Sequence, residues 1–424
     1  MKIWLDQGCA YGNLGDEAML LTAIDHLKKC FPGCQFVIPA HLNKPLPDVG
    51  PYQQLPPPHE MFRLIGAALR RRNWLKYLSR PWLGENWDAY LSSTFIDGLF
   101  KNLPDIQPIY RQLHDAIDAC DMYYAVGAAN LHDWSINESL LPRLWTVQQF
   151  KQRNKPVIIS SQTIGPLTKR FAKYAVRKMV NKADQTTLRD PQVSLSWLNK
   201  IGLSSANIQA IGDEAFALKA AAADLTQKYL DQNGISKNQP YTLFHVRQTT
   251  YRGRLEAQNP QLLKTLRRLA CDRPVLLCPM SYGEHSGLDT HFFEQIKSHL
   301  NLEQIKVAAT ITDPQLARSL VERSHSVVAL SYHLQVFAIA ASKPFICLTS
   351  GPYYEHKAKA ILDWVDPEFR FLINLDDASL NPDLVCDKLS LVYPEFTKHL
   401  NAVRVDIRQR QEKFHSQLPT FTKK

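Results

Sequence analysis

Short hydrophobic runs alternate with longer amphipathic stretches along most of this 424-residue chain. The first run is Ile3–Leu5, after which a glycine turn leads into apolar residues at helical spacing from about Asp16 to Phe31. Gln35–Ile38 then forms the next hydrophobic run. This succession predicts a strand, a helix and a second strand that pairs in parallel with the first. We therefore expect parallel sheets covered by helices.

The alternation continues in two series on either side of a polar stretch at 232–238. Further strands are expected at 122–126, 156–160, 185–188, 241–244, 275–278, 305–307, 326–330 and 344–348. A chain of this length also needs more than one core, because a domain usually holds roughly 100–200 residues. The prediction is an α/β protein with two Rossmann-like domains facing a cleft, with a C-terminal helix.

Breaks in the alternation give the expected domain boundaries. We assign residues 1–220 to an N-terminal domain, 238–372 to a C-terminal domain, and 380–418 to a helix that packs back on the first domain. Residues 43–115 interrupt the first series and are treated as an insertion, whose segment 62–87 mixes Arg and Lys with Trp and Tyr. Such a segment fits a helix lying on an acidic membrane. An ordinary surface helix with a solvated basic face fits it as well, and is favoured.

Composition narrows the classes of partner. The formal net charge of +10 favours anionic partners such as phosphates, nucleotides or acidic lipid. There is no basic recognition helix or aromatic nucleic-acid motif, so nucleic-acid binding is not expected. The eight cysteines lack the paired spacing of a zinc site and are interpreted as reduced thiols. Because neither a signal peptide nor a membrane-length apolar stretch is found, the expected compartment is the cytoplasm.

The turn Gly12–Ala18 directly follows a strand and directly precedes a helix. Its glycines let the backbone approach a ligand, and its amides can face a phosphate or a sugar hydroxyl. Asp16 could instead be an N-cap, with Glu17 favoured in the first helical turn by the helix dipole. The turn alone leaves both interpretations open.

Four other segments at strand ends carry polar residues. Ser161–Pro166 follows one strand, and Arg189 follows the next, where its planar fork suits a carboxylate or phosphate but could also form a structural salt bridge with Asp190. The second series begins with a strand ending in His245 and Arg247, which we expect to face opposite ways, with at least one toward the cleft. His333 precedes an apolar run, where a histidine is either a core residue or a general acid.

Taken together and in this order, these segments resemble the polysaccharide pyruvyl transferase family. The matching motifs are the N-x-G-D-E-A turn, the I-G-P loop, L-R-D-x-x-x-S at 188–194, G-D-E-A-F at 212–216, and the histidine segment followed by Ala340–Pro344. The resemblance spans nearly the whole chain except residues about 43–115 and the last forty or so. Two positions depart from it: Ser331 replaces the arginine of the family's Arg-x-His, and Gly127–Asn130 replaces a Gly-Gly-Gly stretch.

The resemblance implies a cytoplasmic enzyme of glycosyltransferase-B-like architecture. Its activity would transfer a pyruvyl group from phosphoenolpyruvate to two hydroxyls of a sugar as a cyclic ketal, in a cell-surface polysaccharide such as an exopolysaccharide or in its lipid-linked precursor. Phosphoenolpyruvate is then the donor substrate, and no cofactor is implied. A lipid-linked acceptor would bring peripheral contact with acidic membrane at the inner face. The N-terminal domain becomes the acceptor side and the C-terminal domain the donor side.

Site residues follow from the same resemblance. The catalytic residues are His333, Arg189 and Asp16, with His333 protonating the enol carbon or assisting phosphate departure and a carboxylate such as Asp16 or Asp213 taking the acceptor's proton. No metal is assigned. The donor-binding residues are Arg189, Arg247, His333 and Lys357, and the acceptor-binding residues are Asn13, Gly15, Asp16, Gln162 and Asp213.

Two other functions compete with pyruvyl transfer. A nucleotide-sugar-dependent glycosyltransferase of the same architecture would use a similar cleft, and the missing arginine at Ser331 weakens the case for phosphoenolpyruvate. An inactive glycan-binding scaffold subunit is the alternative outside catalysis. Retention of Asn13, Asp16, Arg189 and His333 argues against it.

Overall fold

The computed structural model describes residues 1–7, 12–40, 50–64, 103–203, 208–250, 253–282, 289–391 and 395–422. They form two compact units, each considered by itself below. The first unit comprises Met1–Cys9, Ala23–Ile211 and Glu412–Lys424, and the second comprises Ala10–Thr22 and Gly212–Gln411. Within the described ranges, no helix is both long and apolar enough to cross a membrane.

The first unit is built on a parallel sheet with the strand order β3-β2-β1-β4-β6-β7-β8. Its strands are β1 (Lys2–Asp6), β2 (Gln35–Pro39), β3 (Tyr52–Leu55), β4 (Met122–Ala125), β6 (Val157–Ile164), β7 (Gln185–Leu188) and β8 (Ile208–Ala210), and β5 (Ala128–Leu131) pairs with the second half of β6. Strand β4 is fully buried, and β1 is buried except at its two ends, because helices cover both faces of the sheet, which explains their continuous apolar runs. The strand order reverses between β1 and β4.

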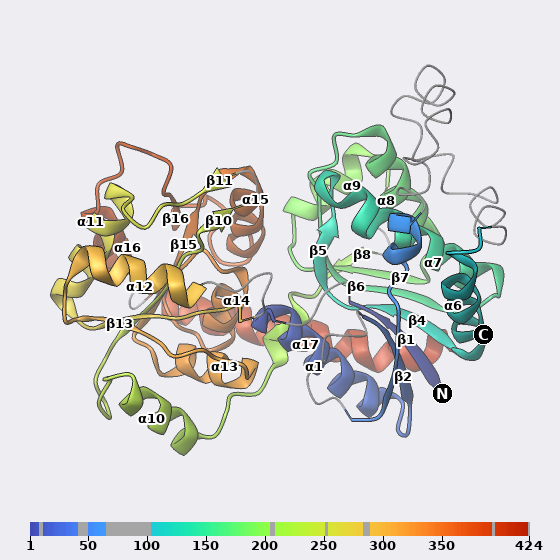
Figure 1. The fold of residues 1–424 in the computed structure, drawn as a ribbon, viewed down its shortest axis with the longest axis horizontal. Coiled ribbons are helices and arrows are strands. Elements are labelled where there is room, and N and C mark those ends of the chain that lie inside the picture. Colours follow the sequence, from blue (N-terminus) through green and yellow to red (C-terminus); the bar gives the residue numbers. More distant parts are fainter. Residues whose placement is uncertain are drawn as a thin grey trace. The chain divides into compact units, whose positions relative to one another are not determined.

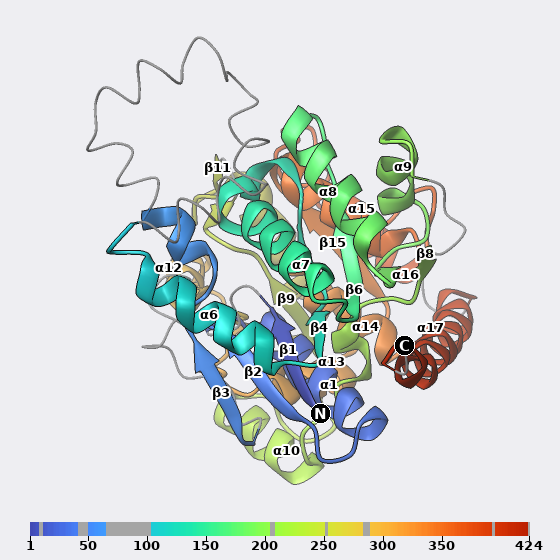
Figure 2. The same cartoon turned by 90° about the vertical axis from the view of Figure 1, so that its right-hand side faces the viewer.

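Helices cover both faces of this sheet (Figures 1 and 2). Helices α6, α7 and α8 lie on one face, and the C-terminal part of α1 lies on the other beside the end of α17. The imidazoles of His26 and His415 stack there with their centroids 4.0 Å apart. The bounds are α1 (Leu14–Cys30), α6 (Gln107–Ala119), η2 (Asp133–Ser135), η3 (Ile136–Leu140), α7 (Leu141–Gln152), α8 (Arg170–Lys182), α9 (Val193–Lys200) and α17 (Glu395–Phe421).

The second unit has a six-stranded parallel sheet with the order β13-β12-β9-β14-β15-β16. Numbered along the chain within this unit, the order is 3-2-1-4-5-6, which is that of a Rossmann fold. Its elements are η4 (Glu214–Ala217), α10 (Ala223–Gln232), β9 (Thr242–His245), α11 (Pro260–Asp272), β12 (Val275–Leu277), α12 (Asp289–Leu300), β13 (Ile305–Val307), α13 (Pro314–Arg323), β14 (Ser326–Ala329), α14 (Tyr332–Ala340), β15 (Phe345–Thr349), α15 (Gly351–Leu362), β16 (Leu372–Asn374) and α16 (Asp383–Leu391), together with the hairpin of β10 (Thr249–Thr250) and β11 (Gly253–Arg254).

Three details differ from the sequence prediction. The expected insertion at 43–115 is too long, because β3 is an edge strand paired with β2 and α6 precedes β4 in the sheet. The segment expected to follow a strand at 161–164 is part of β6, which continues because its second half pairs with β5. The expected C-terminal helix is two helices, α16 and α17. Most of the basic aromatic segment 62–87 lies outside the described residues, and the predicted domain boundaries stay predictions.

Candidate active site

The glycine turn at the start of α1 pairs with the segment that follows β12. Asn13 forms an antiparallel bridge with Ser281, the Leu14 amide donates to the Met280 carbonyl at 3.0 Å, and the Tyr282 amide donates to the Gly12 carbonyl at 2.9 Å. Because these bonds join backbone groups, they fix the path of the turn. The turn therefore belongs to the second unit, although the strand before it belongs to the first.

Side chains strengthen this pairing. Asn13 caps α1, since its Oδ1 accepts from the Gly15 amide at 3.0 Å, so the capping role considered for Asp16 is filled by Asn13. Glu17 is 1% exposed, and its Oε1 accepts from the Gly12 amide at 2.9 Å and from the Tyr282 hydroxyl at 2.5 Å. Burial raises the pKa of Glu17 to about 7 despite these two hydrogen bonds.

His333 lies directly against this turn. A Cβ atom added to Gly15 would stand 1.8 Å from the His333 Nδ1 atom, so the imidazole occupies the space that any other side chain would need. His333 is the second residue of α14, after β14, and is 7% exposed. The structure thus brings together two predicted site residues that are more than three hundred positions apart in the sequence.

A cation lies over the tyrosine that packs against the histidine. The Lys357 Nζ atom is 5.4 Å from the ring centre of Tyr332 and 5.3 Å from that of Tyr353, within the range of cation–π attraction. The Tyr332 ring in turn packs edge-on against His333, with the centroids 5.5 Å apart. Lys357, a predicted donor-binding residue, is therefore held beside the His333 segment by two tyrosines.

Arg247 supplies a second cation at the same end of the sheet. Its Nε lies 3.4 Å from the Asp289 Oδ1, and its Nη2 donates to the Ser281 hydroxyl at 2.7 Å. The Asp289 Oδ2 lies 3.4 Å from the His245 Nε2. The prediction that His245 and Arg247 face opposite ways is wrong, since residues two apart in an extended segment share a face and both side chains reach one carboxylate.

Asp289 organises this part of the site. Its Oδ2 also accepts from the Met280 and Ser281 amides, both at 3.0 Å. Burial alone would raise its pKa, but Arg247, His245 and the amide donors outweigh burial and hold the Asp289 pKa at about 2. Burial also lowers the pKa of His245, so that ring is neutral near pH 7. Asp289 is thus a permanent anion that orients Arg247.

Gly15 contacts His333, His333 packs against Tyr332, and Tyr332 lies under Lys357. A second series of contacts leads from Asn13 of the glycine turn through Ser281 to Arg247. Apart from the turn, the residues lie in segments that follow β12, β9, β14 and β15, and the strand order reverses between the two middle strands, β9 and β14. In open α/β sheets this switch point is where ligands bind. An imidazole and two cations there suit a substrate with more than one anionic group.

Two predicted residues lie in the first unit. Arg189 follows β7, is 1% exposed, and its amide donates to the Gln162 carbonyl of β6 at 3.1 Å. The neighbouring Asp190 accepts from the Ser194 amide and hydroxyl at 2.5 and 2.6 Å, and the Ser194 hydroxyl accepts from the Ile164 amide at 2.8 Å. The L-R-D-x-x-x-S motif therefore ties the end of β7 to the end of β6 and places Arg189 beside Gln162.

The two predicted acceptor carboxylates have different surroundings. Asp16 is half-buried in the first turn of α1, where the helix dipole favours its charge. Asp213 is 3% exposed and caps η4, its Oδ1 accepting from the Ala215 amide at 2.7 Å, while its carbonyl accepts from the Gln411 side chain at 2.8 Å. Since η4 packs against α14, Asp213 supports the helix that carries His333.

Sequence reasoning missed several residues of the site. Glu17 was considered only for its interaction with the helix dipole, and Tyr282, Asp289 and Tyr353 were not singled out. Asp289 begins a helix, and Tyr282 follows a strand end, so position offered a weak signal for both. Their pairing with Glu17 and Arg247 depends on contacts between distant segments. In the described part of the chain, no group of three or more His, Cys, Asp or Glu could hold a metal.

Comparison with solved structures places the fold. The chain is similar to Anabaena HepE in complex with UDP (13% identity, 99% of both chains, TM-score 0.56) and to a glycosyltransferase from Rickettsia africae (13% identity, 100% of this chain and 98% of that one, TM-score 0.53). A putative UDP-N-acetylglucosamine 2-epimerase from Listeria monocytogenes is also similar (13% identity, 94% and 90%, TM-score 0.53). The fold is that of the glycosyltransferase-B class, with two Rossmann-like units.

The sequence match then defines the family within that class. The family model described as polysaccharide pyruvyl transferase matches residues 13–352, which include the glycine turn from Asn13 onward, Arg189, Arg247 and His333. The chain belongs to the polysaccharide pyruvyl transferase family, as its motifs predicted. No functionally curated protein matches the chain.

Proposed function

We propose that this protein transfers a pyruvyl group from phosphoenolpyruvate to two hydroxyls of a sugar, forming a cyclic ketal in a cell-surface polysaccharide or its precursor. The observation that carries the proposal is the packing of His333 on Gly15, with Lys357 joined to the same cluster through Tyr332 and Arg247 joined to it through Ser281. Phosphoenolpyruvate carries a carboxylate and a phosphate. Two cations and one proton donor match that donor substrate better than they match a neutral one.

In this proposal Arg247 and Lys357 bind the two anionic groups. Arg247 is held by Asp289 and Ser281, and its side chain keeps 26% of its surface exposed for a ligand. Lys357 supplies the charge that the family's arginine would supply at Ser331, which lies one residue before the tyrosine under Lys357. A cation restrained by neighbours loses less conformational freedom when it binds an anion.

His333 acts as the acid. It donates its proton to the methylene carbon of phosphoenolpyruvate, which leaves positive charge on the carbon that bears the phosphate. One sugar hydroxyl attacks that carbon and loses its proton to a base, for which Asp16 is the candidate. The second hydroxyl then displaces phosphate, its proton leaves with the phosphate, and the base returns the first proton to His333 through solvent. The products are one ketal and inorganic phosphate.

Phosphate release from phosphoenolpyruvate, measured with a panel of saccharide acceptors, tests the function. We expect release that depends on both substrates, and a His333→Gln variant that loses roughly 100- to 10,000-fold in rate. The matched control is His291→Gln, because His291 is an exposed histidine of α12. Absence of release with every acceptor, or a normal rate in His333→Gln, would overturn the proposal.

The competing glycosyltransferase function is separated by ligand binding. HepE, with the same fold class, was solved with UDP. A ligand at about 100 times its dissociation constant stabilises the folded state by roughly 2.7 kcal/mol. We expect phosphoenolpyruvate to raise the thermal midpoint and UDP-glucose to leave it unchanged; the reverse pattern would favour the nucleotide-sugar donor.

A further inference from the structure

A second polar cluster lies in the first unit, where the strand order reverses between β1 and β4. Asp6 ends β1, and Gln162 lies in the neighbouring part of β6. Arg143, from the first turn of α7, reaches both of them: its Nε is 3.5 Å from the Asp6 Oδ2, and its Nη1 donates to the Gln162 Oε1 at 3.3 Å. The cluster therefore occupies the position where ligands bind in this sheet class.

Neighbouring groups fix two members of the cluster. The Tyr123 hydroxyl donates to the Asp6 Oδ2 at 2.5 Å. The Gln162 amide nitrogen donates to the Val126 and Ser160 carbonyls at 3.0 and 2.7 Å, which sets the orientation of its oxygen toward Arg143. Both partners of the guanidinium are thus held in place by strands of the sheet.

One nitrogen of the cluster has no hydrogen-bond partner among the residues that the structure describes. The Arg143 side chain is 5% exposed, and its Nη2 is buried without a hydrogen-bond acceptor among the described residues. A buried N–H of a charged group that lacks an acceptor is costly, so proteins seldom keep one without a use. Asp6 is 15% exposed, and its contacts in the described part of the chain all use Oδ2, which leaves Oδ1 to accept a hydrogen bond.

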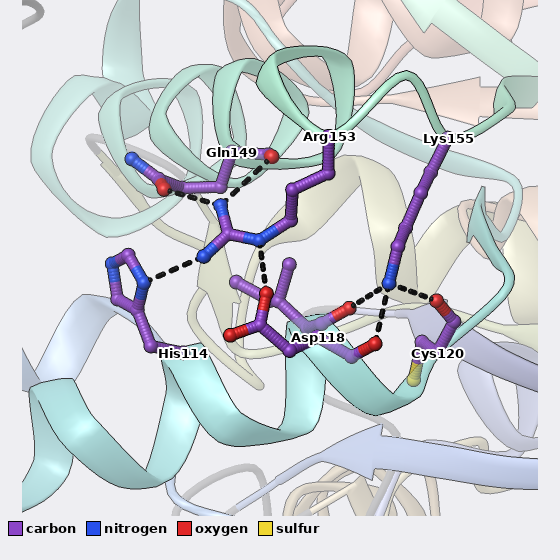
Figure 3. A network of polar contacts seen from close by, with 7 residues as sticks. His114, Asp118, Cys120, Gln149, Arg153 and Lys155 are labelled. Carbon is purple, nitrogen blue, oxygen red and sulfur yellow. Dashed lines mark hydrogen bonds and ion pairs between the residues drawn. The ribbon is translucent and has the colours of Figure 1, made fainter.

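Another arginine at the end of the same helix shows the contrast (Figure 3). Arg153 donates through Nε to Asp118, through Nη1 to the Gln149 carbonyl and side-chain oxygen at 3.1 and 2.9 Å, and its Nη2 lies 2.8 Å from the His114 Nδ1. All three nitrogens have partners: Nε and Nη2 join α7 to α6, and Nη1 bonds within α7. A structural role therefore explains every nitrogen of the Arg153 guanidinium, whereas it leaves the Nη2 of Arg143 unexplained.

We infer that Arg143 and Asp6 bind a hydroxyl of a neutral sugar, with Nη2 donating to its oxygen and Oδ1 accepting its proton. A hydroxyl is both donor and acceptor, and this pair offers one of each. The Asp6 carboxylate would repel a phosphate or carboxylate, and the ion pair is neutral as a whole, so an anionic ligand is disfavoured. This inference deepens the proposed function, on which its assignment to the saccharide acceptor rests.

Direct binding tests the cluster without donor turnover. Titration calorimetry with methyl β-galactopyranoside, methyl β-glucopyranoside and methyl α-mannopyranoside, in the absence of phosphoenolpyruvate, should show binding of at least one glycoside. Arg143→Gln should weaken it at least about tenfold, the usual worth of a hydrogen bond to a charged group. Arg143→Lys keeps the charge beside Asp6 but lacks the second nitrogen, so it should weaken binding similarly while preserving the fold.

Arg153→Gln is the matched control and should lower the thermal midpoint without changing glycoside affinity. The inference is overturned if no glycoside binds the unaltered protein, if Arg143→Lys binds as the unaltered protein does, or if Arg153→Gln weakens binding as much as the Arg143 variants. Glycoside binding without phosphate release from phosphoenolpyruvate would instead reject the proposed function and leave this site standing.

Discussion

The His333 imidazole rests on the backbone of Gly15, so that a methyl group on Gly15 would fall 1.8 Å from Nδ1 and 2.2 Å from Cγ. This contact joins the family's glycine turn to its histidine segment, two motifs separated by most of the chain. Glycine is required at position 15 because the His333 ring occupies the space of a Cβ atom. The backbone does not require it, since Gly15 lies within the helix α1. The turn therefore sets where the proposed acid stands.

Gly15→Ala should displace the imidazole. We expect a fall in phosphate release comparable to that of His333→Gln, with a stability loss of about 1–3 kcal/mol from overpacking. In a His333→Ala background the same change should cost little stability, since the ring is gone, and activity should stay absent. Denaturant unfolding of the four proteins measures this coupling. Equal stability losses in both backgrounds would show that the loss does not come from the contact between residue 15 and His333.

Lys357→Met should raise the KM for phosphoenolpyruvate at least about tenfold, because a charge-assisted contact to the donor is lost. Adding Ser331→Arg to that variant should recover most of the loss, because it restores a cation one residue from Tyr332. Steady-state kinetics with varied donor measure both effects. Lys359→Met is the control, since Lys359 pairs with Glu355 at 2.6 Å. A double variant no better than Lys357→Met would contradict the compensation.

Glu17 should make stability depend on pH between about 4.5 and 7. Its carboxyl has a pKa near 4.5 in the unfolded chain and about 7 in the folded one, so the folded state binds the proton more tightly. Its contribution is greatest below pH 4.5 and is lost as the pH rises toward 7, by up to about 3 kcal/mol. Glu17→Gln should remove this dependence. Urea midpoints of both proteins across that range would show parallel curves if Glu17 were not involved.

Asp289→Asn should weaken both donor binding and folding. Loss of the carboxylate leaves Arg247 without its anionic partner, so the KM for phosphoenolpyruvate should rise and stability should fall by about 3 kcal/mol. Because the Asp289 pKa is about 2 in the folded state, its stabilisation is present above about pH 4 and is lost as the pH falls toward 2. The difference between the two proteins should therefore shrink in acid. A constant difference would assign the effect to packing.

The elements that the sequence predicted well are those with a strong local signal. The buried strands of the second sheet are continuous apolar runs, and the prediction misplaced their ends by one residue at most. The glycine turn was recognisable because strand, turn and helix are contiguous. Edge strands β3 and β16 were missed because they are short and only partly buried, so that neither apolar continuity nor strict alternation marks them.

The site was harder to predict because its interacting residues are far apart in the sequence and come together only in the folded sheet. Arg143 lies in a helix whose other residues are mostly buried. A charged residue in such an apolar helix indicates a specific role, and the sequence prediction did not consider it. Its meaning depends on Asp6 and Gln162, which come from separate strands. Likewise Glu17 and Tyr282 are 265 positions apart, and no local pattern pairs them. The roles assigned to Arg189, His333 and Asp16 stay predictions until the variants are measured.

Because α1 and α17 are each divided between the two units, a single cut in the chain cannot separate the units. Residues up to 22 of α1 belong to the second unit and the rest to the first, while α17 changes unit at 411. A fragment cut at 211 would keep the glycine turn and lose the Ser281 and His333 contacts that shape it. Exchanging the second unit between relatives would therefore require four junctions rather than one.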